Sequence, residues 1–164
     1  MFKRLRTIAE AMLIEGGEAP EQDEARGIGQ ADPAEAAFPA SRPSILLVED
    51  DFLVGMEAEA ALADAGYEVA GVATTAAEAI AIAAARRPAL VVMDIRLAGR
   101  RDGVDAAIEI FRSFGIRSLF ASAHGDAQVR ARAEAARPLG WVAKPYRVQT
   151  LLSAVESALR EVES

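Results

Sequence analysis

The sequence predicts an α/β fold, a doubly wound sheet of five parallel strands with helices on both faces. Short apolar runs alternate with helical patterns from residue 44 to the end of the 164-residue chain. The runs at 45–48 and 90–93 are continuously apolar, as expected of parallel strands that are buried on both faces. Because strands and helices alternate five times over about 120 residues, a parallel sheet is favoured over a sandwich or a bundle.

The first half of this region has clear local signals. Residues 52–65 read as a helix that Gly66 closes, since glycine readily adopts the left-handed conformation after a helix. Residues 68–72 read as an edge strand. Thr74 or Thr75 is expected to cap a helix that runs to about residue 87, just before Pro88.

The second half repeats the alternation. We expect a strand, a helix, a strand, an arginine-rich helix, a short strand and a final amphipathic helix, at 90–93, 103–113, 116–121, 126–137, 141–143 and 147–162. Pro138 and Gly140 end the arginine-rich helix in this prediction. The apolar stripe of the final helix is expected to pack on the core.

The chain before Pro43 has a different composition. Residues 1–15 hold one short amphipathic helix, which is too short to be stable alone. Residues 16–43 are rich in glycine, proline and acids and predict a flexible linker, because they cannot bury enough apolar surface to offset the entropy of ordering. We therefore expect three parts, namely the helix, the linker and a domain at 44–164. The short helix is expected to make a protein contact, with a membrane-surface anchor as the alternative.

Composition excludes several functions. The chain has no cysteine and one histidine, which removes disulfides, thiolate metal sites and multi-histidine sites. Its net charge of −7 disfavours nucleic-acid binding. No apolar run approaches the roughly 20 residues that span a bilayer. Glu10 and Glu15 interrupt the N-terminal segment, so no signal peptide is predicted and a cytoplasmic location is expected.

Polar residues follow four of the predicted strands. Glu49, Asp50 and Asp51 follow the first, Asp94 the third, Ser122 the fourth and Lys144 the fifth. The carboxyl ends of parallel strands share one edge of a sheet, where ligands bind beside a switch in strand order. A single aspartate after a strand is more often a cap than a functional group, but four features in register predict one site.

These groups suit phosphoryl transfer. Clustered carboxylates repel one another unless a cation lies among them, and oxygen ligands beside phosphate favour Mg²⁺. One carboxylate can act as a nucleophile and form an acyl phosphate. An ammonium and a hydroxyl can then hold the phosphoryl oxygens.

Five short motifs occur in residues 44–164: ILLVEDD at 45–51, VVMDIRL at 91–97, Asp102-Gly103, FASA at 120–123 and WVAKPY at 141–146. With these motifs, residues 44–164 resemble the receiver domain of two-component response regulators, a (βα)5 flavodoxin-like fold. The motifs occur in the family's order and spacing. They also coincide with the predicted strand ends.

The resemblance implies a role for each site residue. Asp94 is the phosphorylated aspartate, and Lys144 pairs with the phosphoryl group. Asp50 and Asp94 bind Mg²⁺, Glu49 holds it through water, and the carbonyl of Arg96 is a further ligand. Ser122 is the switch hydroxyl and Trp141 the switch aromatic, while Asp51 is expected to be a helix cap. The Lys144–Pro145 bond is expected to be cis.

Three features depart from the family pattern. The loop from Asp94 to Asp102 is one residue longer than usual and carries arginines in place of a proline. Trp141 is larger than the usual switch residue, so its rotation is expected to be restricted. His124 is at the rim of the site, where a solvated loop histidine is favoured over an effect on water access.

The predicted function is that of a signalling receiver and not of an enzyme with its own substrate. Its partner would be a histidine kinase or a histidine phosphotransfer protein. Only two residues follow the last helix, so no DNA-binding or enzymatic output domain is expected, and the protein would bind a partner or act as a phosphate sink. One rival is a small-molecule phosphatase, which Arg96 disfavours because it occupies the place of the usual second acid. The other is a phosphorylation-independent interaction module.

The sequence allows two interpretations for each of two groups of residues. Arg130, Arg132 and Arg137 predict a solvated helix face, with pairing across a homodimer formed by the last two helices and the fifth strand as the alternative. Phe52 and Met56 are either core residues or a surface on which a kinase docks.

Overall fold

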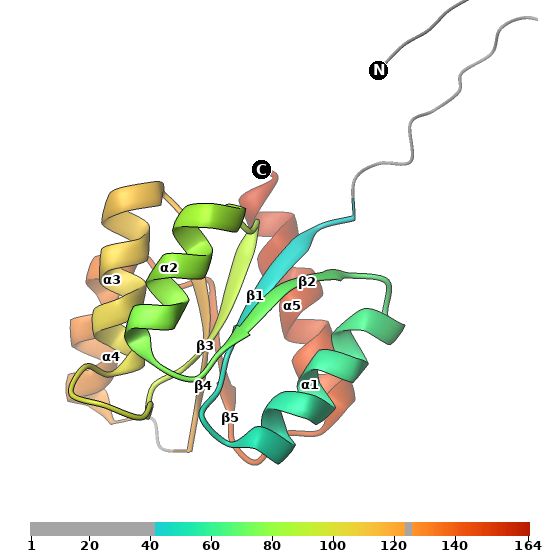
Figure 1. The fold of residues 1–164 in the computed structure, drawn as a ribbon, viewed down its shortest axis with the longest axis horizontal. Helices are drawn as coiled ribbons and strands as arrows, with labels where there is room; N and C mark the ends of the chain where they lie inside the picture. The colour runs from blue at the N-terminus through green and yellow to red at the C-terminus, as the bar shows by residue number, and fades with distance from the viewer. Residues whose placement is uncertain (1–41, 124–125) are drawn as a thin grey trace, which may run out of the picture. The chain divides into compact units, whose positions relative to one another are not determined.

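A five-stranded parallel sheet runs through the computed structural model, which describes residues 42–123 and 126–164. Strands and helices alternate along the chain (Figure 1). The strands are β1 (Ser44–Val48), β2 (Glu68–Ala73), β3 (Leu90–Asp94), β4 (Ser118–Ser122) and β5 (Gly140–Ala143). The helices are α1 (Phe52–Asp64), α2 (Ala76–Arg86), α3 (Gly103–Phe114), α4 (Ala127–Ala133) and α5 (Val148–Val162), with a 3₁₀ turn, η1 (Glu134–Ala136), after α4.

The strand order β2-β1-β3-β4-β5 places a topological switch between β1 and β3. The chain leaves β1 toward one edge of the sheet and then returns to β3 on the other side of β1. Val48 pairs with Met93 in the register of these two strands, so the next residues, Glu49 and Asp94, emerge side by side. This is the place where open α/β sheets bind ligands.

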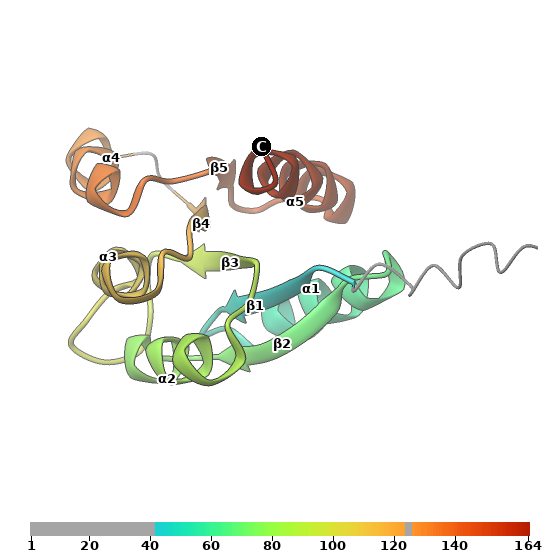
Figure 2. The same cartoon turned by 90° about the horizontal axis from the view of Figure 1, so that it is seen from above.

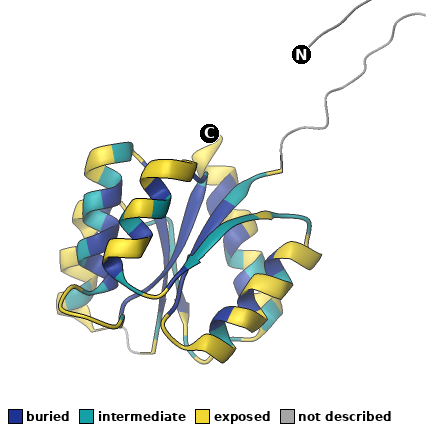
Figure 3. Cartoon of the chain, in the orientation of Figure 1, coloured by how far each residue is buried: buried dark blue, intermediate teal, exposed yellow. Residues whose placement is uncertain are grey.

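Helices cover both faces of the sheet. Seen from above in Figure 2, α2, α3 and α4 lie on one face, and α1 and α5 on the other. The side chains of β1 alternate between the two cores, because successive residues of a strand point to opposite faces. Leu46 and Val48 join the first core, and Ile45 and Leu47 join the second. The strands are accordingly the most buried part of the fold (Figure 3).

The predicted helix ends are largely confirmed. Asp51 caps α1, Thr75 caps α2 and Asp102 caps α3, each through a side-chain oxygen that accepts backbone N–H groups. Gly66 follows the C-cap of α1 with a φ of 93°. The predicted cis bond between Lys144 and Pro145 is also present.

Two predicted boundaries were wrong. The arginine-rich helix ends as regular α-helix at Ala133 instead of residue 137, and a 3₁₀ turn follows it. Arg137 adopts a left-handed conformation with a φ of 49°. Its neighbour Pro138 disfavours the right-handed helical conformation in the residue before it, which accounts for the end of the helix but not for the left-handed backbone. Strand β4 begins at Ser118, two residues later than predicted, and extends to Ser122.

Some expectations fall on residues that are not described. The helix at 1–15, nearly all of the linker at 16–43 and His124 are among them, and the division into three parts stays a prediction. Within 42–123 and 126–164, no helix combines the length and apolar character needed to cross a membrane.

Candidate functional site

Three carboxylates meet at the carboxyl end of the sheet. One ligand oxygen from each of Glu49, Asp50 and Asp94 lies within 4.8 Å of the others. Glu49 and Asp94 are buried, at 3% and 6% exposure, whereas Asp50 is exposed. Two buried acids and one exposed acid so close together are unfavourable unless positive charge lies among them.

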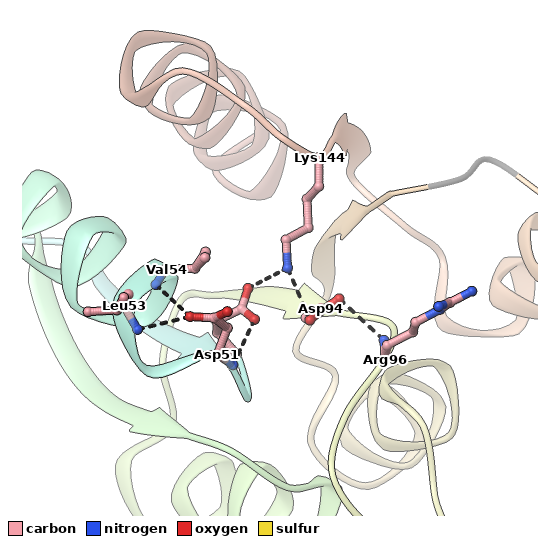
Figure 4. A network of polar contacts seen from close by, with 7 residues as sticks. Asp51, Leu53, Val54, Asp94, Arg96 and Lys144 are labelled. Carbon is pink, nitrogen blue, oxygen red and sulfur yellow. Dashed lines mark hydrogen bonds and ion pairs between the residues drawn. The ribbon is translucent and has the colours of Figure 1, made fainter.

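Lys144 supplies one positive charge from the end of β5. Its Nζ donates to Oε2 of Glu49 at 2.6 Å and to Oδ2 of Asp94 at 3.1 Å. Figure 4 shows the lysine side chain extended across the sheet edge toward Asp94. The side chain is 18% exposed, so the pair is mostly shielded from water. Lys144 therefore holds both buried acids at once.

Burial and charge shift two pKa values at the site. Burial raises the pKa of Glu49, outweighing the hydrogen bonds from Lys144 and the Asp51 amide that favour its charged form, and the negative charge of Asp94 adds to the rise. Burial by itself would lower the pKa of Lys144. The hydrogen bond to Glu49 and the charge of Asp94 outweigh that effect and raise it. Lys144 is therefore charged at neutral pH.

The backbone around Asp94 fixes the position of its side chain. The amide of Arg96 donates to Oδ1 of Asp94 at 3.2 Å (Figure 4). The amide of Gly103 donates to the carbonyl of Ile95 at 2.8 Å. A Cβ atom at position 103 would lie 1.8 Å from the carbonyl oxygen of Asp94, so only glycine fits there. The start of α3 is thus packed directly against the backbone of Asp94.

Ser122 and Lys144 share a cavity with Asp94. Its volume is about 260 Å³, and the α4 segment contributes Asp126 and Val129 to its wall. Ser122, the last residue of β4, is half-buried there. The structure thus brings together the predicted acids, hydroxyl and ammonium. The cavity gives a phosphoryl-sized group access to Asp94.

Trp141, on β5, contacts the side chains of two other elements. Its ring stacks on Phe120 with a centroid distance of 4.8 Å and an interplanar angle of 19°. The guanidinium carbon of Arg130 lies 4.5 Å from the centroid of the same indole. The indole therefore contacts both the Phe120 ring and the Arg130 guanidinium, and the restriction on its rotation stays a prediction.

The structure also tests the predictions for Asp51, Phe52 and Met56. Asp51 is a helix cap, as predicted, and accepts the amides of Leu53 and Val54 (Figure 4). Phe52 and Met56 are exposed at 74% and 52%, which excludes the core alternative.

Sequence reasoning missed the contact of Arg130 with Trp141 and the ion pair between Arg132 and Asp102. The arginines were visible as exposed charges, but no signal in the sequence indicated their partners.

Comparison with known proteins decides the family. A family model described as the response regulator receiver domain matches residues 45–156, more than half of the chain. The chain belongs to the response regulator receiver family. The receiver fold is also found in a solved structure, the signal receiver domain of a modulated diguanylate cyclase from Desulfovibrio desulfuricans. That domain is 31% identical with a TM-score of 0.69 and covers 74% of this chain and 97% of its own.

Two curated relatives are also similar to the receiver. The transcriptional regulatory protein PdtaR of Mycobacterium tuberculosis is 33% identical over 131 residues, which cover 80% of this chain and 62% of PdtaR. The phyllosphere-induced regulator PhyR of Methylorubrum extorquens is 33% identical over 116 residues, 70% of this chain and 43% of PhyR. The chain thus spans less than two thirds of either relative.

Proposed function

We propose that Asp94 accepts a phosphoryl group from a phosphohistidine on a histidine kinase or a histidine phosphotransfer protein. One observation carries the proposal. Asp94 is a buried carboxylate at the topological switch, fixed by Lys144 and the Arg96 amide, and it lines an accessible cavity. Membership of the receiver family supports the same assignment.

The proposed step is an in-line displacement. A carboxylate oxygen of Asp94 bonds to phosphorus as the phosphorus–nitrogen bond of the phosphohistidine breaks, and the electron pair stays on the imidazole nitrogen of the partner. Lys144 is close enough to Asp94 to pair with the new phosphoryl oxygens. Ser122 faces the same cavity and can donate its hydroxyl proton to one of them.

Mg²⁺ fits the acidic group. Three carboxylates supply only oxygen ligands, and the exposed Asp50 leaves one side open to water, which Mg²⁺ usually retains. Asp50 and Asp94 would hold the ion directly, Glu49 through water, and the carbonyl of Arg96 would add a ligand. When bound, the ion neutralises charge on the phosphoryl group. Lys144 meanwhile remains with Glu49 and Asp94.

The partner would contact the start of α1. Phe52, Leu53 and Met56 are 74%, 71% and 52% exposed and lie just after the carboxylates of the site. Exposed apolar side chains grouped beside a site indicate a protein contact. We propose that these three residues dock the phosphodonor protein, and that the receiver works in the cytoplasm with its kinase.

The output would be a change in protein contacts. The acyl phosphate would bias a two-state receiver through Ser122 and Trp141, and the partner that reads it would bind only one state. Homodimerisation through α4, β5 and α5 stays a prediction. The described glutamates there, Glu156 and Glu161, pair within the chain, with Arg160 and Arg117.

Phosphoramidate tests the proposal directly, since it carries the same phosphorus–nitrogen bond as phosphohistidine. The full chain with phosphoramidate and Mg²⁺ should gain one phosphoryl group by intact mass, and chelation of the Mg²⁺ should prevent the gain. Phe52→Ala should label at the wild-type rate with phosphoramidate but more slowly with a phosphorylated phosphotransfer protein. A chain that never gains a phosphoryl group would contradict the proposal.

A further inference from the structure

Helix α4 is held to the domain by few apolar contacts. Of its seven residues only Ala133 is buried, and Val129 is half-buried. Helix α3 beside it buries five of its twelve residues. Segments that bury little apolar surface open at low free-energy cost. We therefore expect polar contacts to contribute to the position of α4.

Two arginines of α4 make such contacts, each with a different neighbouring element. Arg132 forms an ion pair with Asp102, the residue that caps α3. Arg130 stacks over the indole of Trp141 on β5, at 4.5 Å from its centroid. Both arginines are exposed, and each contacts a residue of another element of the domain.

Both contacts lead to the phosphorylation site. Asp102 precedes Gly103, whose backbone is packed against the carbonyl of Asp94. Trp141 stacks on Phe120, which lies on β4 two residues before Ser122. The α4 segment also forms part of the wall of the cavity that contains Asp94, through Asp126 and Val129. A group that enters this cavity must be accommodated by α4 or by the sheet.

We propose that Arg130 and Arg132 form a two-point latch that holds α4 in its resting position, and that phosphorylation of Asp94 opens this latch. The proposal rests on the proposed function of Asp94. A phosphoryl group brings negative charge into the cavity beside the Asp126 carboxylate, and like charges repel. The sheet is buried on both faces, whereas α4 is weakly packed, so α4 is the wall that moves.

Reciprocity gives the latch a measurable consequence. If filling the cavity opens the latch, weakening the latch must favour filling of the cavity by the same factor. Beryllium fluoride with Mg²⁺ is a suitable probe, because it mimics an aspartyl phosphate without forming one. Its dissociation constant can be measured by calorimetry on the full chain, in equilibrium and without turnover.

The variants remove the charge and leave a shorter, neutral polar side chain, and the same change is made at the control position. Arg132→Gln should bind beryllium fluoride about 5-fold more tightly than wild type, and Arg130→Gln should do so by a similar factor. Asp102→Asn keeps the helix cap but loses the ion pair, so it should match Arg132→Gln, and combining the two should add nothing further. The matched control is Arg160→Gln on α5, whose partner Glu156 is remote from the cavity, and it should bind as wild type does.

Trp141 provides a second measurement, because it is the single tryptophan of the chain. Its emission should change when beryllium fluoride binds to wild type, as the guanidinium of Arg130 departs. In Arg130→Gln this change should be less than half as large. A purely structural role for Arg130 would alter the melting temperature without altering this response.

The outcomes distinguish a failure of the latch proposal from a failure of the proposed phosphorylation of Asp94. Equal or weaker binding of beryllium fluoride by Arg132→Gln, in a wild-type background that phosphoramidate labels on Asp94, would overturn the latch alone. Failure of the wild type to be labelled on Asp94 would overturn the proposed function and the latch with it. Tighter binding in both arginine variants but not in Arg160→Gln would support the latch.

Discussion

The ammonium of Lys144 lies 3.1 Å from Oδ2 of Asp94, although the two residues are 50 positions apart in the chain. The same ammonium reaches Glu49 at 2.6 Å. One cation thus offsets the repulsion between two buried carboxylates while no other cation is bound. Any ligand that brings its own positive charge must share these acids with Lys144.

Replacing Lys144 tests this arrangement. Lys144→Met should lower the free energy of unfolding without Mg²⁺ by about 2 kcal/mol, because two buried carboxylates lose their partner. Millimolar Mg²⁺ should restore part of that loss, since the ion binds the folded state. Denaturant melts with and without Mg²⁺ measure both effects, and Lys144→Arg is the control that keeps the charge. Identical unfolding curves for Lys144→Met and wild type would contradict the role of Lys144.

The metal site predicts different behaviour for two adjacent acids. Wild type should bind Mg²⁺ at roughly millimolar strength, about −4 kcal/mol. Asp50→Asn should weaken binding at least 10-fold, about 1.4 kcal/mol, because a hard ion loses a carboxylate. Asp51→Asn should bind as wild type does, since Asn can still accept the amides of Leu53 and Val54. Calorimetric titration with Mg²⁺ measures both affinities. Weaker Mg²⁺ binding by Asp51→Asn than by Asp50→Asn would show that the ion binds elsewhere.

Two glycines should respond to alanine in opposite directions. Gly103→Ala should destabilise the domain by about 3 kcal/mol or more, because its Cβ would overlap the carbonyl of Asp94. Gly55→Ala within α1 should stabilise it by about 0.5–1 kcal/mol, because the nearest atom to the added Cβ is 3.8 Å away and alanine favours helix. Thermal melts of both variants test the pair. Equal effects would mean that Asp94 does not pack against α3 as described.

Ser118 offers a test of the core. Its hydroxyl is buried at the start of β4 and has no hydrogen-bond partner among the described residues. Ser118→Ala should raise the free energy of unfolding by about 1 kcal/mol, because an unsatisfied polar group is removed. Ser44→Ala, at the half-buried start of β1, should change it by less than about 0.5 kcal/mol. Destabilisation by Ser118→Ala in denaturant melts would indicate that the hydroxyl has a partner after all.

Much of the site could be predicted because it depends on strand ends. Continuous apolar runs located the central strands, and the residue after each run had to lie at one edge of a parallel sheet. The sequence alone therefore predicts that Asp94 and Lys144 lie close together. Glu49 and Asp94 are neighbours because Val48 pairs with Met93 in the parallel register of β1 and β3. This parallel pairing is itself predicted by the alternation of strands and helices.

The contacts of α4 could not be predicted, because they depend on how the helix rotates against its neighbours. Arg130 and Arg132 differ from other exposed arginines only in the residues that they contact, Trp141 and Asp102. The sequence also gives no signal for the change from α-helix to a 3₁₀ turn after Ala133, because Pro138 predicts only that the helix stops before it. The close approach of Gly103 to Asp94 likewise follows from packing, although the Asp102-Gly103 pair was visible in the sequence.

Mapping the phosphorylated residue tests the central claim most directly. Wild type and Asp94→Asn are incubated with phosphoramidate and Mg²⁺, and the labelled peptide is sequenced by mass spectrometry. Wild type should carry one phosphoryl group on Asp94, and Asp94→Asn should carry none. A phosphoryl group that persists in Asp94→Asn, or one mapped to another residue of the wild type, would contradict the account.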